Sequence, residues 1–421
     1  MSPMPGFLIV ILMERVTRNF ANAKHWGRNA KVFVLTEVAW GIPFSWFFFY
    51  QAIFMRSLGM SEVFIGFSMM LLLILQIFLP ILGGSLADKF GRKRVLVVFD
   101  TVGWIGAMVM WLVAREPWQI VVAILFQGLT ATILGVWETL LVEDTEPAYR
   151  AGIYSFIQAI YIFGGILTPI AGAAIFLYGI EQGCRYLFLT ALLVTAAVST
   201  IYQIYLRESK IGKILSSSEE ESPKASGGYT QTLKTVTRHR KLLMLFGLTI
   251  IGAIQNPLVN TYKPLYLTDS KALALDEGVI SIIPMASSIS SLIALSFIVP
   301  RLKNGHIEKA LLFSYVCGFF GLITLVMAPR GSLVLAILSG ILDSARVIAV
   351  TSILRVFFAN AIDEANPFAR AKIMSLITTF SALVSWPAPL LGGYLYAVSP
   401  TLPFVLAATF LVLSISLTLK I

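Results

Sequence analysis

The dominant pattern along the chain is a series of apolar runs about 20 residues long, separated by short segments that hold most of the charged residues. A helix of about 20 apolar residues crosses the hydrocarbon core of a bilayer, so each run predicts one membrane span. The pattern therefore predicts an all-α integral membrane protein with twelve transmembrane helices. The predicted spans are 32–55, 63–87, 95–114, 118–143, 152–178, 185–206, 242–267, 278–299, 309–328, 332–358, 370–397 and 401–420.

Two segments outside these spans set the expected domain boundaries. Residues 1–31 are expected to form a cytoplasmic basic arm, which is either a segment bound to the membrane surface or a disordered tail. Residues 207–241 are rich in Ser, Glu and Gly, a composition that is typical of a solvated cytoplasmic linker. The arm and the linker therefore bound an N-terminal six-helix bundle at 32–206 and a C-terminal six-helix bundle at 242–421.

Charge is sparse in this chain and unevenly placed. Charged residues make up 13% of the sequence, which is about half of the fraction usual in soluble proteins. The net charge of +10 does not indicate a nucleic-acid partner, because the basic residues cluster in loops between apolar runs. Most of them lie on the side of the arm, the linker and the C-terminus, while the opposite loops hold Arg56, Arg115, Arg185, Lys263, Lys271 and Arg330. The positive-inside rule therefore predicts a multi-pass protein of the cytoplasmic membrane with both termini in the cytoplasm.

An internal repeat relates spans 4 and 5 to spans 10 and 11. Pro147, Arg150, Pro169 and Gly172 correspond in one register to Pro367, Arg370, Pro389 and Gly392. The acidic pair Glu143-Asp144 corresponds likewise to Asp363-Glu364. Shared apolar composition does not align prolines, an arginine, a glycine and an acidic pair together. The two six-helix bundles are therefore expected to be pseudo-symmetric.

The loop between spans 2 and 3 is dense in charge and bracketed by glycines. It reads Gly-Gly-Ser-Leu-Ala-Asp-Lys-Phe-Gly-Arg-Lys-Arg-Val from Gly83 to Val95. This loop resembles the signature loop of the major facilitator superfamily of transporters, Gly-x-Leu-Ala-Asp-x-x-Gly-Arg-Lys/Arg. The matching residues are Gly84, Leu86, Ala87, Asp88, Gly91, Arg92 and Lys93. The resemblance implies the fold of that superfamily, two parallel six-helix repeats around a central cavity, and names no substrate.

The resemblance also implies a latch at the cytoplasmic end. In the superfamily, the aspartate of this loop faces the start of span 11, and its arginine reaches acidic residues that end span 4. Those positions are Asp88, Arg92 and Glu143 or Asp144 here, and span 11 starts near Pro367. The second copy of the loop, around Lys303-Asn304-Gly305, lacks the aspartate, so the latch is expected to be one-sided.

Two glycines of this loop have predicted structural roles. Gly84, together with Gly83, is expected to let span 2 approach a neighbouring helix closely, since glycine has no side chain. Gly91 is expected to permit the turn, because glycine adopts conformations that other residues avoid.

Polar side chains inside the spans are the candidates for a solute path, because ionisable residues are costly in a bilayer and are usually functional there. They are Glu37 in span 1, Glu138 in span 4, Asn256 and Asn260 in span 7, and Asp343, Arg346 and Arg355 in span 10. The resemblance implies that these four spans line the central cavity. Outside them, only Asp100 in span 3 attracts notice, and Lys263 is interpreted as a lysine that reaches the outer surface.

Roles follow from depth and residue type. Arg346, Asp343, Asn256, Asn260 and Trp40 are the predicted solute contacts, with Trp137 and Trp386 as further cavity walls. Asp343 and Arg346 lie three residues apart on one helix face and are expected to pair. Glu37, Glu138 and Asp343 are the predicted proton carriers, because a carboxyl in a low dielectric can exchange a proton near neutral pH. Arg355 is expected to pair with Glu37 or Glu138 as a cytoplasmic gate.

Two further motifs bear on coupling. The segment from Thr168 to Ala173 resembles a degraded form of the Gly-Pro-x-x-Gly-Gly motif in span 5 of drug exporters. Many proton-coupled members of the superfamily carry an arginine three residues before a Gln-Gly pair in span 4. Gln127-Gly128 is present here, but the arginine position is Ile124, so the usual proton-coupling residue is replaced.

The sequence thus predicts a secondary active transporter that moves a small organic solute by alternating access, coupled to protons. Two directions stay open: a drug/proton antiporter for amphipathic compounds, and an uptake symporter for a polar or anionic metabolite. The alternative class is a membrane sensor or scaffold that does not transport. No enzyme, cofactor or metal site is expected, and the expected partners are the solute, protons or another coupling ion, and lipid, with the chain as a monomer.

Overall fold

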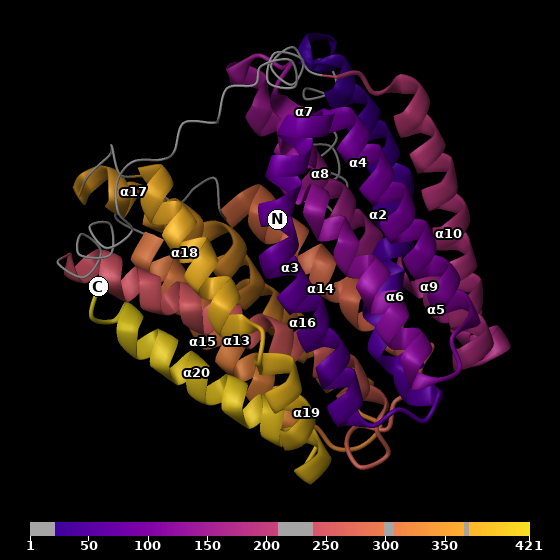
Figure 1. The fold of residues 1–421 in the computed structure, drawn as a ribbon. Helices are drawn as coiled ribbons and strands as arrows, with labels where there is room; N and C mark the ends of the chain where they lie inside the picture. The colour runs from indigo at the N-terminus through magenta and orange to yellow at the C-terminus, as the bar shows by residue number, and fades with distance from the viewer. Residues whose placement is uncertain (1–21, 209–238, 299–306, 366–369) are drawn as a thin grey trace, which may run out of the picture. The chain divides into compact units, whose positions relative to one another are not determined.

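The computed structural model describes residues 22–208, 239–298, 307–365 and 370–421 and is drawn in Figure 1. Every regular element of the described residues is helical. Within these described ranges, eleven helical segments have the length and hydropathy to cross a membrane, and the shorter apolar helix α20 (Leu402–Thr418) lies in the twelfth predicted span. These helices confirm the predicted all-α membrane fold. A helix suits the bilayer because it satisfies its backbone hydrogen bonds internally.

Several predicted spans are single helices. They are α2 (Arg28–Ser57), α3 (Glu62–Phe90), α10 (Ile180–Tyr205), α13 (Arg240–Thr268) and α15 (Ile307–Met327). The twelfth span is likewise one helix, α20, and the remaining six spans are interrupted helices whose pieces follow one another along the chain. Span 3 is α4 (Arg92–Asp100), the π-helical turn η2 (Thr101–Ile105) and α5 (Gly106–Val113). Span 4 is α6 (Pro117–Leu129), η3 (Thr130–Ile133) and α7 (Leu134–Val142).

Spans 5, 8, 10 and 11 are interrupted in the same way. Their pieces are α8 (Pro147–Ile166) with α9 (Thr168–Tyr178), η4 (Val279–Ser281) with α14 (Ile282–Ile293) and η5 (Ala294–Ile298), α16 (Leu333–Ile348) with η8 (Ala349–Ile353) and α17 (Leu354–Ala365), and α18 (Arg370–Ser385) with α19 (Ala388–Val398). The breaks in spans 5 and 11 lie just before Pro169 and Pro389, as expected of residues that remove a helical hydrogen bond.

Two compact units are distinguished by their internal contacts. The first takes in the described parts of Met1–Phe47, Phe78–Gly164 and Arg185–Glu220, and the second takes in Phe48–Ile77, Gly165–Cys184 and the described parts of Glu221–Ile421. In the first unit, α5 packs on α6, and in the second unit α16 packs on α14 and α15. The unit boundaries fall inside α2, α3, α8 and α10, so the predicted bundle boundaries at 206 and 242 stay a prediction.

The two glycines expected to allow close helix packing behave differently. A Cβ atom on Gly83 would lie 1.7 Å from the backbone oxygen of Thr132, so α3 approaches η3 only because this residue is glycine. A Cβ atom on Gly84 would meet no described atom within 4 Å. The expectation for Gly84 is therefore wrong, because the next position of a helix points about 100° away from the contact face.

Residue Gly91 has the backbone conformation that the sequence predicts. Its φ angle is +89°, a region that residues with a side chain rarely adopt, and it separates α3 from α4. The glycine therefore permits the sharp change of direction at the charged loop.

The described end of the basic arm packs against the first unit. Trp26 is 5% exposed and lies edge-on against Phe156 of α8, and the backbone N–H of Gly27 donates a hydrogen bond to the Thr145 hydroxyl. Residues 22–31 are thus a folded part of the helical unit. Residues 1–21, most of the linker (209–238), the loop copy around Lys303-Asn304-Gly305 and Pro367 lie outside the described residues.

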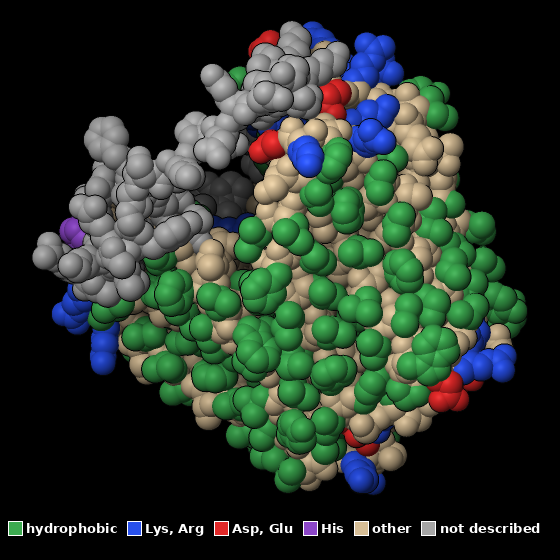
Figure 2. Space-filling view, in the orientation of Figure 1, with side chains coloured by type: hydrophobic (Ala, Val, Ile, Leu, Met, Phe, Trp, Pro, Cys, Tyr) green, Lys and Arg blue, Asp and Glu red, His purple; other side chains and the backbone are tan. Residues whose placement is uncertain are grey.

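Side chains are sorted along the helices as a membrane environment requires. Figure 2 shows hydrophobic side chains over the flanks of the helices, with Lys, Arg, Asp and Glu gathered near helix ends. Large apolar side chains such as Phe176, Leu177 and Val334 are more than 70% exposed. This exposure is expected where the hydrocarbon of lipid replaces water around a helix.

Candidate functional site

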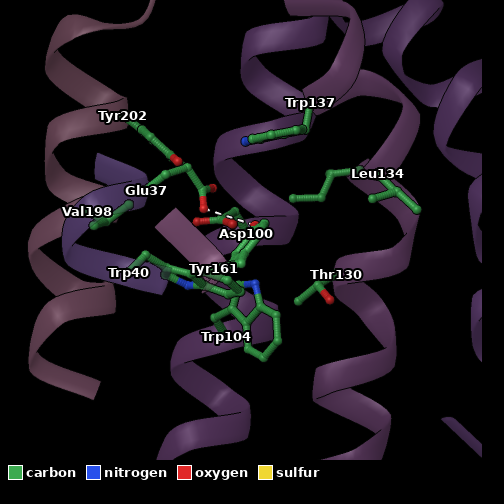
Figure 3. A pocket seen from close by; sticks show the side chains of 11 residues that line it. Glu37, Trp40, Asp100, Trp104, Thr130, Leu134, Trp137, Tyr161, Val198 and Tyr202 are labelled. Atoms are coloured by element: carbon green, nitrogen blue, oxygen red, sulfur yellow. Dashed lines mark hydrogen bonds between the residues drawn. The ribbon is translucent and has the colours of Figure 1, made fainter. Parts of the chain in front are cut away.

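A pocket within the first unit brings together side chains from five spans (Figure 3). Its volume is about 170 Å³. Glu37 and Trp40 come from α2, Asp100 ends α4, and Trp104 lies on the π-helical turn η2. Trp137 of α7, Tyr161 of α8 and Tyr202 of α10 complete its polar and aromatic wall, together with Thr130, Ile133, Leu134 and Val198.

Two carboxyl groups point into this pocket (Figure 3). Glu37 is only 6% exposed, and its Oε2 accepts a hydrogen bond of 3.0 Å from the Tyr161 hydroxyl. Asp100 is half-buried on the facing helix. Neither carboxyl group forms an ion pair with a Lys, Arg or His of the described chain, so neither has a cation that would compensate its charge when it is ionised.

Aromatic rings surround the carboxyl groups. Trp40 stacks on Phe44 with a centroid distance of 4.0 Å and meets Trp104 edge-on at 5.4 Å. On the other side of the pocket, Trp137 packs on Phe33 at 5.5 Å. These contacts hold the tryptophans in place, since each ring is fixed by a neighbour from the bundle interior. Trp40 and Trp137 thus line a pocket inside the first unit, while their predicted role at a central cavity between the two bundles stays a prediction.

Asp100 stood out in the sequence as an acidic residue of span 3 but has no predicted role, and Trp104 is not among the predicted site residues. Both lie in span 3, which the family resemblance does not place at the cavity. The π-helical turn at Thr101–Ile105 follows Asp100 directly and changes the direction of the side chains after it. No residue propensity in the sequence predicts that turn. The signal for this site was Asp100 itself, because an isolated acidic residue in an apolar run indicates a functional position.

Glu138 does not share this pocket. It follows Trp137 on α7, and its side chain is exposed rather than directed at Glu37. Trp137 and Glu138 therefore point to different sides of the helix, and only Trp137 lines this pocket. The predicted pairing of Glu37 or Glu138 with Arg355 would join the two units and stays a prediction; Arg355 is exposed on α17.

A second polar cluster lies inside the other unit. Arg346 Nε donates to Asp343 Oδ1 at 2.6 Å, which confirms the predicted pair on one face of α16. Lys263 Nζ of α13 contacts Asp343 Oδ2 at 3.2 Å, and Arg346 Nη1 donates to Asn256 Oδ1 at 2.9 Å. The cluster therefore joins one carboxylate to two cations and carries a net positive charge.

The predicted solute contacts in this part of the chain differ in burial and in the partners of their side chains. Arg346 is fully buried, and its side chain covers Gly318 of α15, where a Cβ atom would lie 2.7 Å from the arginine. Direct contact between Arg346 and a solute therefore requires a change of conformation. Lys263 was expected to reach the outer surface, but it points at Asp343 instead, because an ion pair inside the bundle outweighs snorkelling. Asn260 is exposed and joins no described side chain.

One ion pair predicted for the latch is present within the first unit, while the latch itself stays a prediction. Arg92 Nη1 forms an ion pair with Glu143 Oε2, and both side chains are less than 15% exposed. Asp144 is exposed, so Glu143 is the member of the acidic pair that the arginine selects. Asp88 is half-buried and has no hydrogen bond or ion pair within the described chain. Its predicted partner near Pro367 lies outside the described residues.

An ion pair that the sequence did not suggest ties two helix ends in the second unit. Arg56 Nη2 at the end of α2 contacts Asp269 Oδ2 at 2.8 Å, and the Tyr396 hydroxyl donates to the same oxygen at 2.9 Å. Burial alone raises the pKa of Asp269, but the backbone N–H of Lys271, the Tyr396 hydroxyl and the Arg56 guanidinium together hold it below its ordinary value. The carboxylate is therefore ionised at neutral pH and holds Arg56 on α13.

Trp386 lies in the break between α18 and α19 and is half-buried there.

Within the described residues, no group of three or more His, Cys, Asp or Glu side chains could hold a metal ion.

Comparison with known proteins agrees with the fold and with the charged loop. The family model described as Major Facilitator Superfamily matches residues 32–384. A Na(+), Li(+), K(+)/H(+) antiporter of Planococcus maritimus is 25% identical over 264 residues, which cover 59% of this chain and 59% of that protein. The multidrug resistance protein MdtH of Proteus mirabilis is 28% identical over 132 residues, 31% of this chain and 33% of that protein.

The chain thus spans less than two thirds of the length of the curated relatives it matches. Among solved structures, the nucleoside transporter NupG superposes with a TM-score of 0.67 over 93% of this chain and 97% of that one, at 16% identity. An identity this low shows a shared fold and nothing about the solute.

Proposed function

The chain belongs to the major facilitator superfamily and is a multi-pass membrane transporter rather than an enzyme; we propose that it couples the movement of a small organic solute to protons through Glu37. The observation that carries this proposal is a carboxyl group that is 6% exposed and has no cationic partner among the described residues. An unpaired buried carboxylate is costly, and a proton or a cation removes the cost. Glu37 is thus suited to alternate between these two partners.

The other two predicted proton carriers are less suited to that role. Asp343 already contacts Lys263 and Arg346, so its charge is compensated in the absence of any proton. Glu138 is exposed on α7 and lies outside the pocket. Of the three carboxyl groups, only Glu37 combines burial, a hydrogen-bond donor and an open pocket. This difference favours a proton site in the first unit.

We favour antiport over symport for this transporter. An uncompensated acidic pocket attracts cations and repels anions, which supports exchange of a proton for a cationic or amphipathic compound. The relatives described as a cation/proton antiporter and as multidrug resistance proteins agree with this direction. The uptake symporter for a polar or anionic metabolite is the alternative, with Arg346, Asn256 and Asn260 as its contacts. It is weaker because Arg346 is fully buried and already bonded.

The test is solute-driven proton movement in proteoliposomes. The purified full-length chain is reconstituted with a pH-sensitive dye inside the vesicles, and candidate solutes are added outside at equal pH. Antiport predicts loss of protons from the lumen as a transported solute enters. Uptake symport predicts acidification instead. Solute binding without any proton or solute movement would favour the non-transporting sensor or scaffold.

The same proposal gives the Arg92–Glu143 ion pair a mechanical role, as part of a cytoplasmic latch that breaks and reforms. Asp88, Gly91 and Arg355 are the further residues of this proposed latch and gate. The proposal places both termini and this loop in the cytoplasm and treats the chain as a monomer in lipid, with a six-helix bundle on each side of the linker.

Reversing one charge of this pair, Arg92→Glu, is expected to destabilise the chain by about 1–3 kcal/mol, because it leaves two carboxylates together at a partly buried site. The double variant Arg92→Glu with Glu143→Arg is expected to regain most of the melting temperature. A working latch predicts that transport falls in the single variant and recovers in the double. If transport stays unchanged in a folded single variant, the pair is only structural.

A further inference from the structure

The chemistry of the pocket goes beyond a proton site. It combines two carboxyl groups, three tryptophans and a tyrosine that lies against one of the carboxyls. We infer that this pocket binds the head group of a small organic cation, a quaternary or protonated amine, between Glu37, Asp100 and the faces of Trp40, Trp104 and Trp137. The inference rests on the proposed function in using the same carboxyl group for the solute and for the proton.

Charge determines which ligands the pocket accepts. None of the described residues that line it is Lys, Arg or His, while Glu37 and Asp100 both face it. An anion brought to this place would meet two negative charges without a compensating donor, and like charges in a low dielectric repel strongly. A cation gains attraction from both carboxylates. The pocket is therefore selective for positive charge before any detail of shape is considered.

The aromatic wall indicates an organic cation rather than a bare metal ion. The face of a tryptophan ring attracts quaternary and protonated amines, and it is the strongest of the aromatic side chains in this respect. Figure 3 shows Trp137 on one side of the carboxyl groups and Trp40 with Trp104 on the other. An alkali ion prefers a shell of oxygen ligands, whereas this wall presents mostly carbon.

Size limits the ligand further. An apolar protein cavity of about 150 Å³ holds one benzene molecule. The pocket volume of about 170 Å³ is therefore large enough for a head group such as trimethylammonium and smaller than the 300 Å³ or more, roughly, of a site for a drug-sized molecule. A larger amphipathic solute would place only its charged end here.

Only one of the two carboxyl oxygens of Glu37 has a hydrogen-bond partner among the described residues. Its Oε2 accepts the hydrogen bond from Tyr161, and no described residue donates to its other carboxyl oxygen. Buried polar atoms are normally hydrogen-bonded, and Glu37 is only 6% exposed, so its second carboxyl oxygen can accept a bond from a ligand or take up a proton. A proton and an organic cation would satisfy the same group and compete for it.

The binding test uses purified full-length protein in detergent and needs no transport. Choline chloride is the probe, and its uncharged carbon isostere, in which carbon replaces the ammonium nitrogen, is the matched control ligand. Choline is expected to change tryptophan fluorescence and to raise the melting temperature, whereas the isostere does neither. Since choline keeps its charge at every pH, weaker binding on acidification reports protonation of the protein.

Variants locate the binding site. Glu37→Gln and Trp40→Leu are each expected to weaken choline binding about tenfold or more, as the loss of a charge pair or a cation–π contact implies. Asp100→Asn serves as a second carboxyl variant if Trp40→Leu does not fold. The matched controls are Glu308→Gln on α15 and Trp118→Leu on α6, which replace exposed residues of the same types outside the pocket. Both are expected to keep the affinity of the parent.

Three results would overturn the inference. They are equal binding of choline and its carbon isostere, equal affinity in Glu37→Gln and the parent, and displacement of choline by equimolar LiCl or KCl, which would assign the pocket to inorganic cations. Each result is separate from the transport test. Choline binding without proton movement would refute the proposed coupling and leave this site standing, while Glu37-dependent proton movement without choline binding would do the reverse.

Discussion

Replacing Glu37 by Gln is expected to reduce proton-coupled transport by at least about 100-fold, the scale of loss when an essential proton-transfer group is removed. Gln preserves the volume of the side chain and keeps an oxygen that accepts the hydrogen bond from Tyr161. It cannot bind and release a proton. Transport driven by a pH gradient in proteoliposomes should therefore vanish, while the fold and its melting temperature remain close to those of the parent.

Solute exchange separates this effect from general damage. Counterflow of labelled against unlabelled solute requires the carrier to cycle but moves no net protons, so the Glu37→Gln variant should retain it if the solute still binds. Glu308→Gln is the control and should transport like the parent. If Glu138→Gln stops proton movement and Glu37→Gln does not, the proton site lies on α7 and the proposal for Glu37 is wrong.

Removing Asp343 is expected to have the largest effect on stability. The carboxylate lies between Arg346 Nε at 2.6 Å and Lys263 Nζ at 3.2 Å. Since Arg346 is fully buried, Asp343→Ala leaves its charge without a counter-ion, and such a loss costs about 3–5 kcal/mol. The melting temperature of the purified protein in detergent should fall accordingly.

A double variant tests the cause of that loss. Combining Asp343→Leu with Arg346→Met removes both charges and fills the space with apolar groups, so stability should largely return. Lys263→Met alone should cost less, because Lys263 is partly exposed and can be solvated. An unchanged melting temperature in Asp343→Ala would mean that the ion pair contributes nothing and that the cluster is free to bind solute.

The two polar clusters illustrate two ways of placing charge in a membrane protein. In one, Asp343 is neutralised by neighbours within its own unit, which suits a structural role. In the other, Glu37 has a hydrogen-bond donor but no cation, which suits exchange with a proton or a solute. Residue type alone did not distinguish these cases, because both are acidic residues inside apolar runs.

The sequence by itself determined the class of this protein. The apolar runs and the placement of Lys and Arg predicted the membrane spans, since bilayer thickness and the cost of buried charge act on every span separately. The repeat and the resemblance of the loop from Gly83 to Val95 then predicted a transporter of known fold. The Asp343–Arg346 pair was predictable for the same reason, because both residues lie on one helix at a fixed spacing.

Only the tertiary structure decided which polar residues meet. It placed Asp100 and Trp104 beside Glu37, sent Glu138 elsewhere and turned Lys263 toward Asp343. Position along a span sets the depth of a side chain, but rotation of the helix and turns such as Thr101–Ile105 set its direction. Those rotations come from packing between segments that are far apart in the chain, and the hydrophobic pattern of a single span does not contain them.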